Sequence, residues 1–156
     1  MRSMTRPVPG DAAPAWEMTA DDGSLVRRDD LLGHRYVLYF YPKDDTAGCT
    51  VQACGLRDSF ARVTSSGVQI FGVSPDSVRS HASFRAKYGL PFPLLADAKH
   101  RTAEEFGVWI EKTFAGRTYF GNERSSFVIG PDGRIEHVLA RVKPAEHVDL
   151  LLEALA

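Results

Sequence analysis

The sequence has few cysteines, no long apolar run and no excess of charge of either sign. Its 156 residues include two cysteines, and the formal net charge at neutral pH is -1. A chain this close to neutral offers no electrostatic footprint for nucleic acid or for an anionic membrane surface. The longest clear apolar run, residues 36–41, is far shorter than the about 20 residues of a membrane-spanning helix. We therefore expect neither a nucleic-acid partner nor a membrane partner.

The N-terminal residues also lack the apolar stretch of a secretory signal, since Met1 to Pro7 are mostly polar or basic. We therefore expect a cytoplasmic protein, in a compartment that keeps thiols reduced. Two neighbouring cysteines in such a compartment are more often catalytic, redox-sensing or metal-binding than a structural cross-link.

The patterning along the chain predicts one domain of alternating strands and helices. Residues 1–15 are rich in Pro, Ala and Gly and predict a flexible N-terminal arm, and residues 16–156 predict a single domain. We expect strands at 17–20, 24–27, 36–41, 68–73, 94–96, 126–129 and 135–139, a short turn of helix at 29–33, and helices at 50–65, 77–88, 102–106 and from Pro144 onward. This order predicts an α/β fold with a mixed central β-sheet flanked by helices on both faces.

Both cysteines lie in one short segment, directly after the apolar run at 36–41. Cys49 falls near the predicted start of a helix, where unpaired N–H groups and the helix dipole favour an anion. Because the thiolate is the nucleophilic form of cysteine, this position favours a reactive Cys49. Thr46 places a hydroxyl on the same approach, and Pro42 fixes the chain as it leaves the strand and can shield the site from water.

Cys54 follows Cys49 by five residues, and this spacing has a geometric consequence. In an intact helix the Cα atoms of residues five apart are about 8.6 Å apart. A disulfide seldom tolerates more than about 7 Å. If both cysteines are helical when reduced, they can join only after the first turns unwind, so the spacing fits a pair that bonds during turnover.

Other cysteine chemistries fit the sequence less well. A dithiol oxidoreductase would use Cys-x-x-Cys, whereas the spacing here is Cys-x-x-x-x-Cys. A structural zinc site needs about four ligands. The histidines are scattered along the chain, at His34, His81, His100, His137 and His147. Packing of Cys49 as a small buried hydrophobe is the remaining alternative.

The pattern Pro42-x-x-x-Thr46-x-x-Cys49 resembles the active-site signature of peroxiredoxins. The wider stretch 40–50, followed by Ala53 and Cys54, is similar to the Q-type branch, also called bacterioferritin comigratory protein. The resemblance covers residues 15–156 and continues in three segments far from the cysteines: 72–77, 87–95 and 123–127. It implies a thioredoxin-like fold and a peroxide-reducing cysteine.

The resemblance assigns a role to each matching residue. Cys49 matches the peroxidatic cysteine, and Cys54 matches the resolving cysteine found in many members of the branch. Thr46 matches the hydroxyl that hydrogen-bonds the thiolate and the peroxide, and Pro42 matches the shielding proline. Arg124 matches the arginine that stabilises the thiolate, although its position alone would indicate a surface arginine before a strand.

The implied reaction reduces hydrogen peroxide or an alkyl hydroperoxide to water or an alcohol. Cys49 would become a sulfenic acid, Cys54 would condense with it to a disulfide, and thioredoxin or a similar dithiol would reduce that disulfide. The reaction requires no cofactor and no metal. The branch contains monomers and dimers, and we expect a monomer, with a dimer as the alternative.

Three other functions are open to a chain of this kind. A peroxide sensor or redox relay would use the same cysteine, whereas a binding module on the same fold would have no need of Cys49, Thr46 and Arg124 together. A copper-delivery protein would need Cys-x-x-x-Cys and a suitable histidine.

One position departs from the family pattern, because Ala47 stands where a proline is common and so removes a φ constraint. We expect Asp44 and Asp45 to be solvated loop charges, with contacts to the reductant as the alternative.

Overall fold

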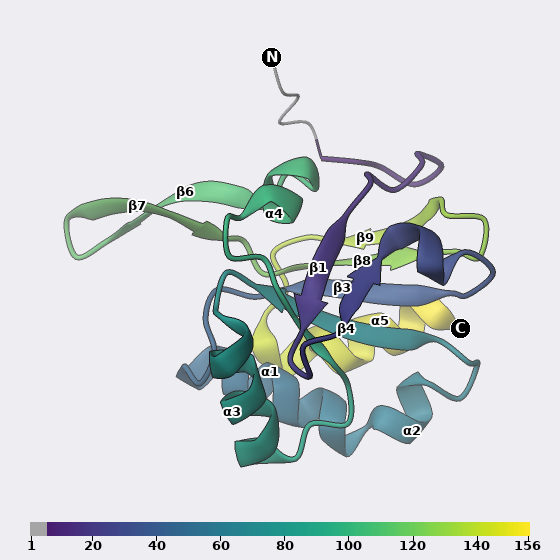
Figure 1. The fold of residues 1–156 in the computed structure, drawn as a ribbon, viewed down its shortest axis with the longest axis horizontal. Helices are drawn as coiled ribbons and strands as arrows, with labels where there is room; N and C mark the ends of the chain where they lie inside the picture. The colour runs from purple at the N-terminus through teal and green to yellow at the C-terminus, as the bar shows by residue number, and fades with distance from the viewer. Residues whose placement is uncertain (1–5) are drawn as a thin grey trace.

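The computed structural model describes residues 6–156, and its main element is a seven-stranded mixed sheet (Figure 1). The strand order is β2-β1-β5-β4-β3-β8-β9. These strands are β1 (Glu17–Ala20), β2 (Leu25–Arg27), β3 (Tyr36–Phe40), β4 (Gln69–Ser74), β5 (Leu94–Ala96), β8 (Ser125–Ile129) and β9 (Ile135–Leu139). β3, β4 and β5 are parallel to one another, and the other pairings are antiparallel. The predicted mixed sheet is therefore confirmed.

Helices cover both faces of this sheet. They are η1 (Arg28–Leu31), α1 (Ala47–Asp58), α2 (Phe60–Val63), α3 (Val78–Tyr88), α4 (Arg101–Glu105), η2 (Pro144–Glu146) and α5 (His147–Leu155). α1, α2, α3 and α5 lie on one side of the sheet and α4 on the other (Figure 1). Within residues 6–156, no helix is long and apolar enough to span a membrane.

β3 runs through the middle of the sheet and is buried along its whole length. Tyr36, Leu38 and Phe40 pack into the core on the α4 side. Val37 and Tyr39 pack into the core on the α1 side. This two-sided burial explains why the sequence of β3 is apolar without alternation. The strand delivers the following loop, and with it the cysteine segment, to the carboxyl edge of the parallel strands.

β4 depends on a glycine where it passes β3. Gly72 pairs with Tyr39 in the parallel register. A Cβ atom at Gly72 would lie 2.8 Å from Leu94 Cδ2 and 2.9 Å from Tyr39 Cζ. Only a residue without a side chain fits between these two packed groups.

The helix that carries the cysteines begins earlier and ends earlier than the predicted 50–65. α1 spans Ala47–Asp58, with Thr46 as its N-cap in an extended conformation. The backbone leaves helical geometry at Ser59, and α2 follows as a separate short turn. The predicted core face persists through the break, because Leu56 and Val63 are both buried.

A hairpin that the sequence analysis did not identify extends away from the sheet (Figure 1). Its strands are β6 (Trp109–Phe114) and β7 (Arg117–Asn122). The connecting residues Ala115 and Gly116 both have positive φ, as expected of a two-residue hairpin turn. The base of the hairpin is joined to the sheet by Asn122, whose side-chain Nδ2 donates to the carbonyl of Tyr41 at 3.2 Å.

The described part of the predicted N-terminal arm lies against the sheet, and residues 1–5 of the arm lie outside the described residues. Gly10 N donates to Ile135 O at 2.9 Å, and Ala12 forms an isolated bridge with Arg134. Ala13 is buried. The division of the chain into an arm and a domain stays a prediction.

The packing at Gly72 gives a test of this fold. Gly72→Ala should lower the free energy of unfolding by about 1–3 kcal/mol, because the new methyl group overpacks the contact with Tyr39 and Leu94. Gly55→Ala in α1 is the matched control, since its Cβ would lie 3.6 Å from Val148 Cγ2, an ordinary contact. That control should be neutral or stabilising by up to about 1 kcal/mol. Urea denaturation measures both, and a Gly72→Ala protein as stable as the wild type would contradict the packing described.

Candidate active site

Cys49 lies in the first turn of α1, with its side chain buried at 2% exposure. The unpaired N–H groups of this turn and the positive end of the helix dipole surround the place where a thiolate would form. Both cysteines are free thiols. The sulfur of Cys49 is therefore protected from bulk water and lies at the end of the helix that favours an anion.

Arg124 meets this sulfur from 75 residues further along the chain. Its Nη1 lies 3.4 Å and its Nη2 3.5 Å from Cys49 Sγ. Two N–H donors and a fixed positive charge on one sulfur stabilise the thiolate over the thiol. Gly48 makes room for the guanidinium, because a Cβ there would lie 3.1 Å from Arg124 Nη2.

The guanidinium is held by a chain of buried polar side chains. Arg124 Nη1 donates to Gln52 Oε1 at 2.6 Å. Gln52 Nε2 lies 3.0 Å from His147 Nδ1, and His147 Nε2 lies 2.7 Å from Ser126 Oγ. Gln52, Ser126 and His147 are all at most 1% exposed. The chain links α1, the start of α5 and strand β8 to the arginine.

The direction of each hydrogen bond in this chain follows from Arg124. A guanidinium can only donate, so Gln52 accepts through its oxygen and donates through its nitrogen. His147 Nδ1 must then accept, which places the ring proton on Nε2 for donation to Ser126. Burial, and next the positive charge of Arg124, lowers the pKa of His147 to about 3. His147 is therefore a neutral imidazole of one tautomer near neutral pH.

The residue before Arg124 is anchored by a second network. The carboxylate of Glu123 is almost buried and forms ion pairs with Arg6 and Arg141. Ser125 Oγ also donates to it at 2.7 Å. Burial alone would raise the pKa of Glu123, but the bonds from Ser125 and Arg6 leave that pKa below its usual value. The backbone on both sides of Arg124 is thus fixed by charged or polar contacts.

Lys112 of β6 brings a second positive charge to the neighbourhood of the site. Its pKa is lowered by burial and, next, by the positive charge of Arg124.

Thr46 and Pro42 flank the loop that leads to Cys49. The hydroxyl of Thr46 is exposed and donates to Lys43 O at 2.9 Å. In the described chain it forms no hydrogen bond to the sulfur of Cys49. Pro42 is half-buried directly after β3. The structure thus joins Cys49 to Arg124 directly, while Thr46 presents its hydroxyl at the N-cap of the same helix.

Cys54 lies in the same unbroken helix and is partly exposed. Five helical residues correspond to a rise of about 7.5 Å and a rotation of about 140° between the two positions. The two cysteines therefore occupy different faces of α1 in this reduced form, and α1 must open locally before they can bond.

The expectation that Asp44 and Asp45 are solvated loop charges is wrong for Asp44. Asp44 is 8% exposed, accepts hydrogen bonds from Tyr41 and Ser80, and is hydrogen-bonded to His81. Asp45 is exposed, as expected, but its carboxylate is paired with Lys87. A run of two aspartates in a loop gave no indication of this burial.

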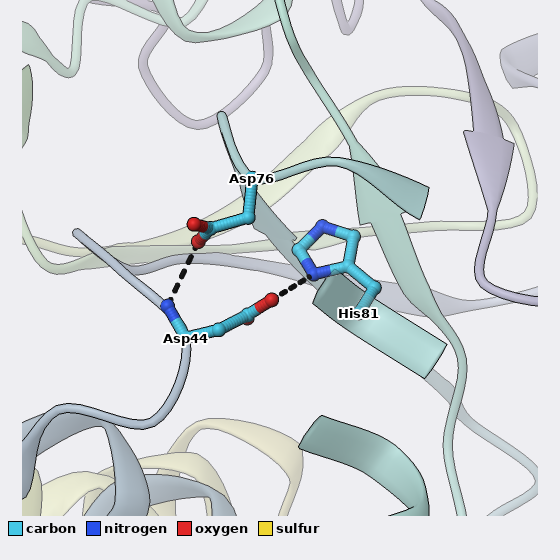
Figure 2. A group of neighbouring side chains, drawn as sticks. All are labelled: Asp44, Asp76 and His81. Carbon is cyan, nitrogen blue, oxygen red and sulfur yellow. Dashed lines mark hydrogen bonds and ion pairs between the residues drawn. The ribbon is translucent and has the colours of Figure 1, made fainter. Parts of the chain in front are cut away.

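Asp44, Asp76 and His81 form the one group of three potential metal ligands among residues 6–156 (Figure 2). The carboxylate of Asp44 is hydrogen-bonded to His81, and the carboxylate of Asp76 accepts from the backbone N–H of Asp44. Both ring nitrogens of His81 are engaged, because Nε2 lies 2.9 Å from Leu95 O and Nδ1 faces Asp44. A ring with no free nitrogen is not arranged to ligate a metal.

Gln52, Ser126 and His147 are site residues that the sequence analysis did not identify. Gln52 follows Cys49 by three residues, a spacing that places both on one side of a helix and could have drawn attention to it. His147 and Ser126 carry no such local signal, because their contact depends on how α5 packs on β8.

The sequence of this chain is similar to those of known proteins. The model of the AhpC/TSA family matches residues 9–138 of the chain. Peroxiredoxin Bcp of Escherichia coli (strain K12) is 46% identical over 143 residues, which cover 92% of each chain. Peroxiredoxin Bcp of Bacillus subtilis (strain 168) is 44% identical over 146 residues, which cover 94% of this chain and 93% of that protein.

Solved structures agree with these matches. The bacterioferritin comigratory protein of Xanthomonas campestris, studied for its alkyl peroxide reduction activity, superposes with a TM-score of 0.86 at 34% identity, covering 97% of this chain and 96% of that chain. A mutant of PrxQ from Xylella fastidiosa superposes with a TM-score of 0.89 at 32% identity, with the same coverage.

The burial of His147 predicts a pH dependence of stability. The folded protein holds the pKa of His147 at about 3, against about 6.5 for an exposed histidine. Between these values the unfolded chain binds a proton that the folded chain does not. The free energy of unfolding should therefore fall as the pH drops from about 6.5 toward 3, by up to about 1.4 kcal/mol per pH unit from this group.

His147→Gln removes the titrating ring and keeps an amide for hydrogen bonding, so its stability should depend less steeply on pH in this range. Urea denaturation at about pH 4.5 and about pH 6.5 measures the difference. His137→Gln, at a partly exposed position on β9, is the control and should keep the wild-type slope. Equal slopes for the wild type and His147→Gln would show that His147 is not held neutral.

Proposed function

The chain belongs to the AhpC/TSA family as a Q-type, or bacterioferritin comigratory protein, peroxiredoxin, and from this membership we propose that Cys49 is its peroxidatic residue. The protein is a thiol-dependent peroxidase, with peroxides as substrates and a thiol as reductant. The observation that carries the assignment to Cys49 is the double contact of the Arg124 guanidinium with its sulfur.

The first step uses the charges around that sulfur. The thiolate of Cys49 attacks one oxygen of the peroxide, an S–O bond forms and the O–O bond breaks. The second oxygen leaves with the electron pair of the broken bond and takes up a proton, giving water or an alcohol. Donors aimed at the developing charge stabilise this transition state, and Arg124 and the N–H groups of the first turn of α1 are suited to that role.

Thr46 and Pro42 complete the proposed site. The hydroxyl of Thr46 donates its hydrogen bond to Lys43 O, so the hydroxyl oxygen can accept a hydrogen bond from the peroxide. Such a bond would orient the peroxide toward the helix N-terminus. Pro42, half-buried at the end of β3, limits the access of water to the same place.

The second step requires α1 to open. The thiol of Cys54 attacks the sulfenic acid of Cys49, a disulfide forms and water leaves. Because the intact helix separates the two residues, the turns between Ala47 and Cys54 must unwind for this bond to form. Cys54 gives the oxidised Cys49 a partner within its own helix, which favours a peroxidase over a relay that awaits a client protein.

We assign the remaining features of the cycle as follows. Hydrogen peroxide and alkyl hydroperoxides are the substrates, and thioredoxin or a similar dithiol reduces the disulfide. A cytoplasmic location supplies such a reductant. A disulfide within one helix needs no second copy of the chain, which supports a monomer.

Two substitutions test the roles of the cysteines. Cys49→Ser should abolish peroxide reduction, because serine is not a nucleophile of comparable strength at neutral pH. Cys54→Ser should leave the first turnover intact and lose recycling by thioredoxin. Stopped-flow oxidation measures the first turnover, and coupled consumption of reducing equivalents measures recycling. Peroxide reduction retained in Cys49→Ser would contradict the proposal.

Intact-mass measurement after one equivalent of peroxide adds a direct readout to the same proteins. The wild type should lose about 2 Da as the disulfide forms, and Cys54→Ser should gain about 16 Da as a persistent sulfenic acid. A Cys54→Ser protein that is recycled normally by thioredoxin would show that Cys54 is not the resolving residue.

A further inference from the structure

The loop between β3 and α1 contains a backbone conformation that needs support. Asp45 has φ of 56°, in the left-handed region that residues other than glycine rarely adopt. The next residue, Thr46, returns to an extended conformation and caps α1. The direction in which α1 starts, and with it the position of Cys49, therefore depends on what holds this loop.

Asp44 is fastened at the N-terminal half of α3. Its carboxyl group accepts from Tyr41 Oη at 2.5 Å and from Ser80 Oγ at 2.8 Å, and it lies 2.7 Å from His81 Nδ1. Its backbone N–H donates to Asp76 Oδ2 at 2.8 Å, as Figure 2 shows. Side chain and backbone of one loop residue are thus fixed by four separate groups.

Asp44 and His81 form a buried hydrogen-bonded pair. Leu95 O can only accept, so His81 Nε2 carries a proton. The Oδ2 atom of Asp44 lies 2.7 Å from His81 Nδ1 and also accepts from Ser80 Oγ. Both side chains are at most 4% exposed. Removal of either partner would leave a buried polar group without its hydrogen bond.

Asp45 is fastened at the other half of α3. Its carboxylate lies 2.7 Å from Lys87 Nζ and accepts from Tyr88 Oη at 2.8 Å. The bonds from Lys87 and then Tyr88 lower the pKa of Asp45. The anchoring points of Asp44 and Asp45 on α3 are seven residues apart, or about 10 Å along the helix.

Two attachment points at this separation fix both the position and the orientation of the loop. We propose that Asp44 and Asp45 are positioning residues for peroxide reduction, which fasten the loop to α3 and thereby hold Thr46 and the first turn of α1 in the reactive arrangement. This inference rests on the proposed role of Cys49. The attachments of the loop do not involve residues of α1.

Ala47 leaves the start of α1 without the φ restraint that a proline would give. Ala47 is the first residue of α1, where proline would fix φ at a helical value without the loss of a hydrogen bond. Thr46, at φ -93° and ψ 158°, already has the extended conformation that a residue before proline requires. Ala47→Pro is therefore compatible with this backbone and would supply by covalent restraint part of what the two carboxylates supply.

The test uses Asp45, which is exposed and whose replacement leaves the core intact. Asp45→Ala should lower the second-order rate constant for oxidation of Cys49 by hydrogen peroxide by at least about fivefold, because misplacement of a reacting group is costly. Lys87→Met should give a similar loss, and the double variant should lose no more than either single variant. Ala47→Pro should restore most of the rate in the Asp45→Ala protein, which a general loss of stability would not predict.

Asp58→Ala is the matched control, because Asp58 is an exposed, ion-paired aspartate at the far end of α1. It should react at the wild-type rate. A wild-type rate in Asp45→Ala, or additive losses in the double variant, would overturn the inference while leaving Cys49 as the peroxidatic residue. Peroxide reduction retained in Cys49→Ser would instead overturn the assignment on which the inference rests.

Discussion

The contact between the guanidinium of Arg124 and the sulfur of Cys49 is the interaction on which the rest of the site depends. A buried sulfur anion would be unfavourable without a positive charge and hydrogen-bond donors beside it. Arg124 provides both at 3.4 and 3.5 Å. Gly48 leaves room for its approach, and the chain through Gln52 and His147 prevents it from turning away.

The same helix has two requirements that oppose each other. A closed first turn gathers the N–H groups that activate Cys49, whereas an open first turn is needed for Cys49 to reach Cys54. The surroundings of α1 suit both states. The loop at Asp44 and Asp45 is held by contacts with α3, and these contacts do not require that the first turn of α1 stays helical. The side chain of Arg124 is instead held by Cys49 and Gln52 of α1 itself. The turn can therefore open and close beside a loop that stays attached to α3.

Much of the fold follows from local patterns in the sequence. Residues that are apolar without alternation predicted β3 and β4, and turn residues predicted the ends of most helices. The β6–β7 hairpin was not predicted, because its exposed strands lack a buried face that would impose an apolar pattern.

Within the site, Cys49 was predicted from its sequence motif and Arg124 from the resemblance to the family. Gln52, His147 and Ser126 were not, since their hydrogen bonds arise only when three distant segments pack together. Asp44 was expected to be exposed to solvent, because the sequence does not distinguish between two neighbouring aspartates in a loop. The burial of Asp44 depends on its contact with His81 of α3.

The central claim is that Arg124 makes Cys49 reactive, and the most direct measurement is the rate constant for a single oxidation of Cys49 by hydrogen peroxide in Arg124→Lys. Lysine keeps the charge but loses the pair of donors that meets the sulfur. The account predicts a fall of about 10²-fold or more, as for the loss of a donor that stabilises developing charge. Arg79→Lys, at an exposed position on α3, should react like the wild type. A folded Arg124→Lys protein that also reacts at the wild-type rate would contradict the claim.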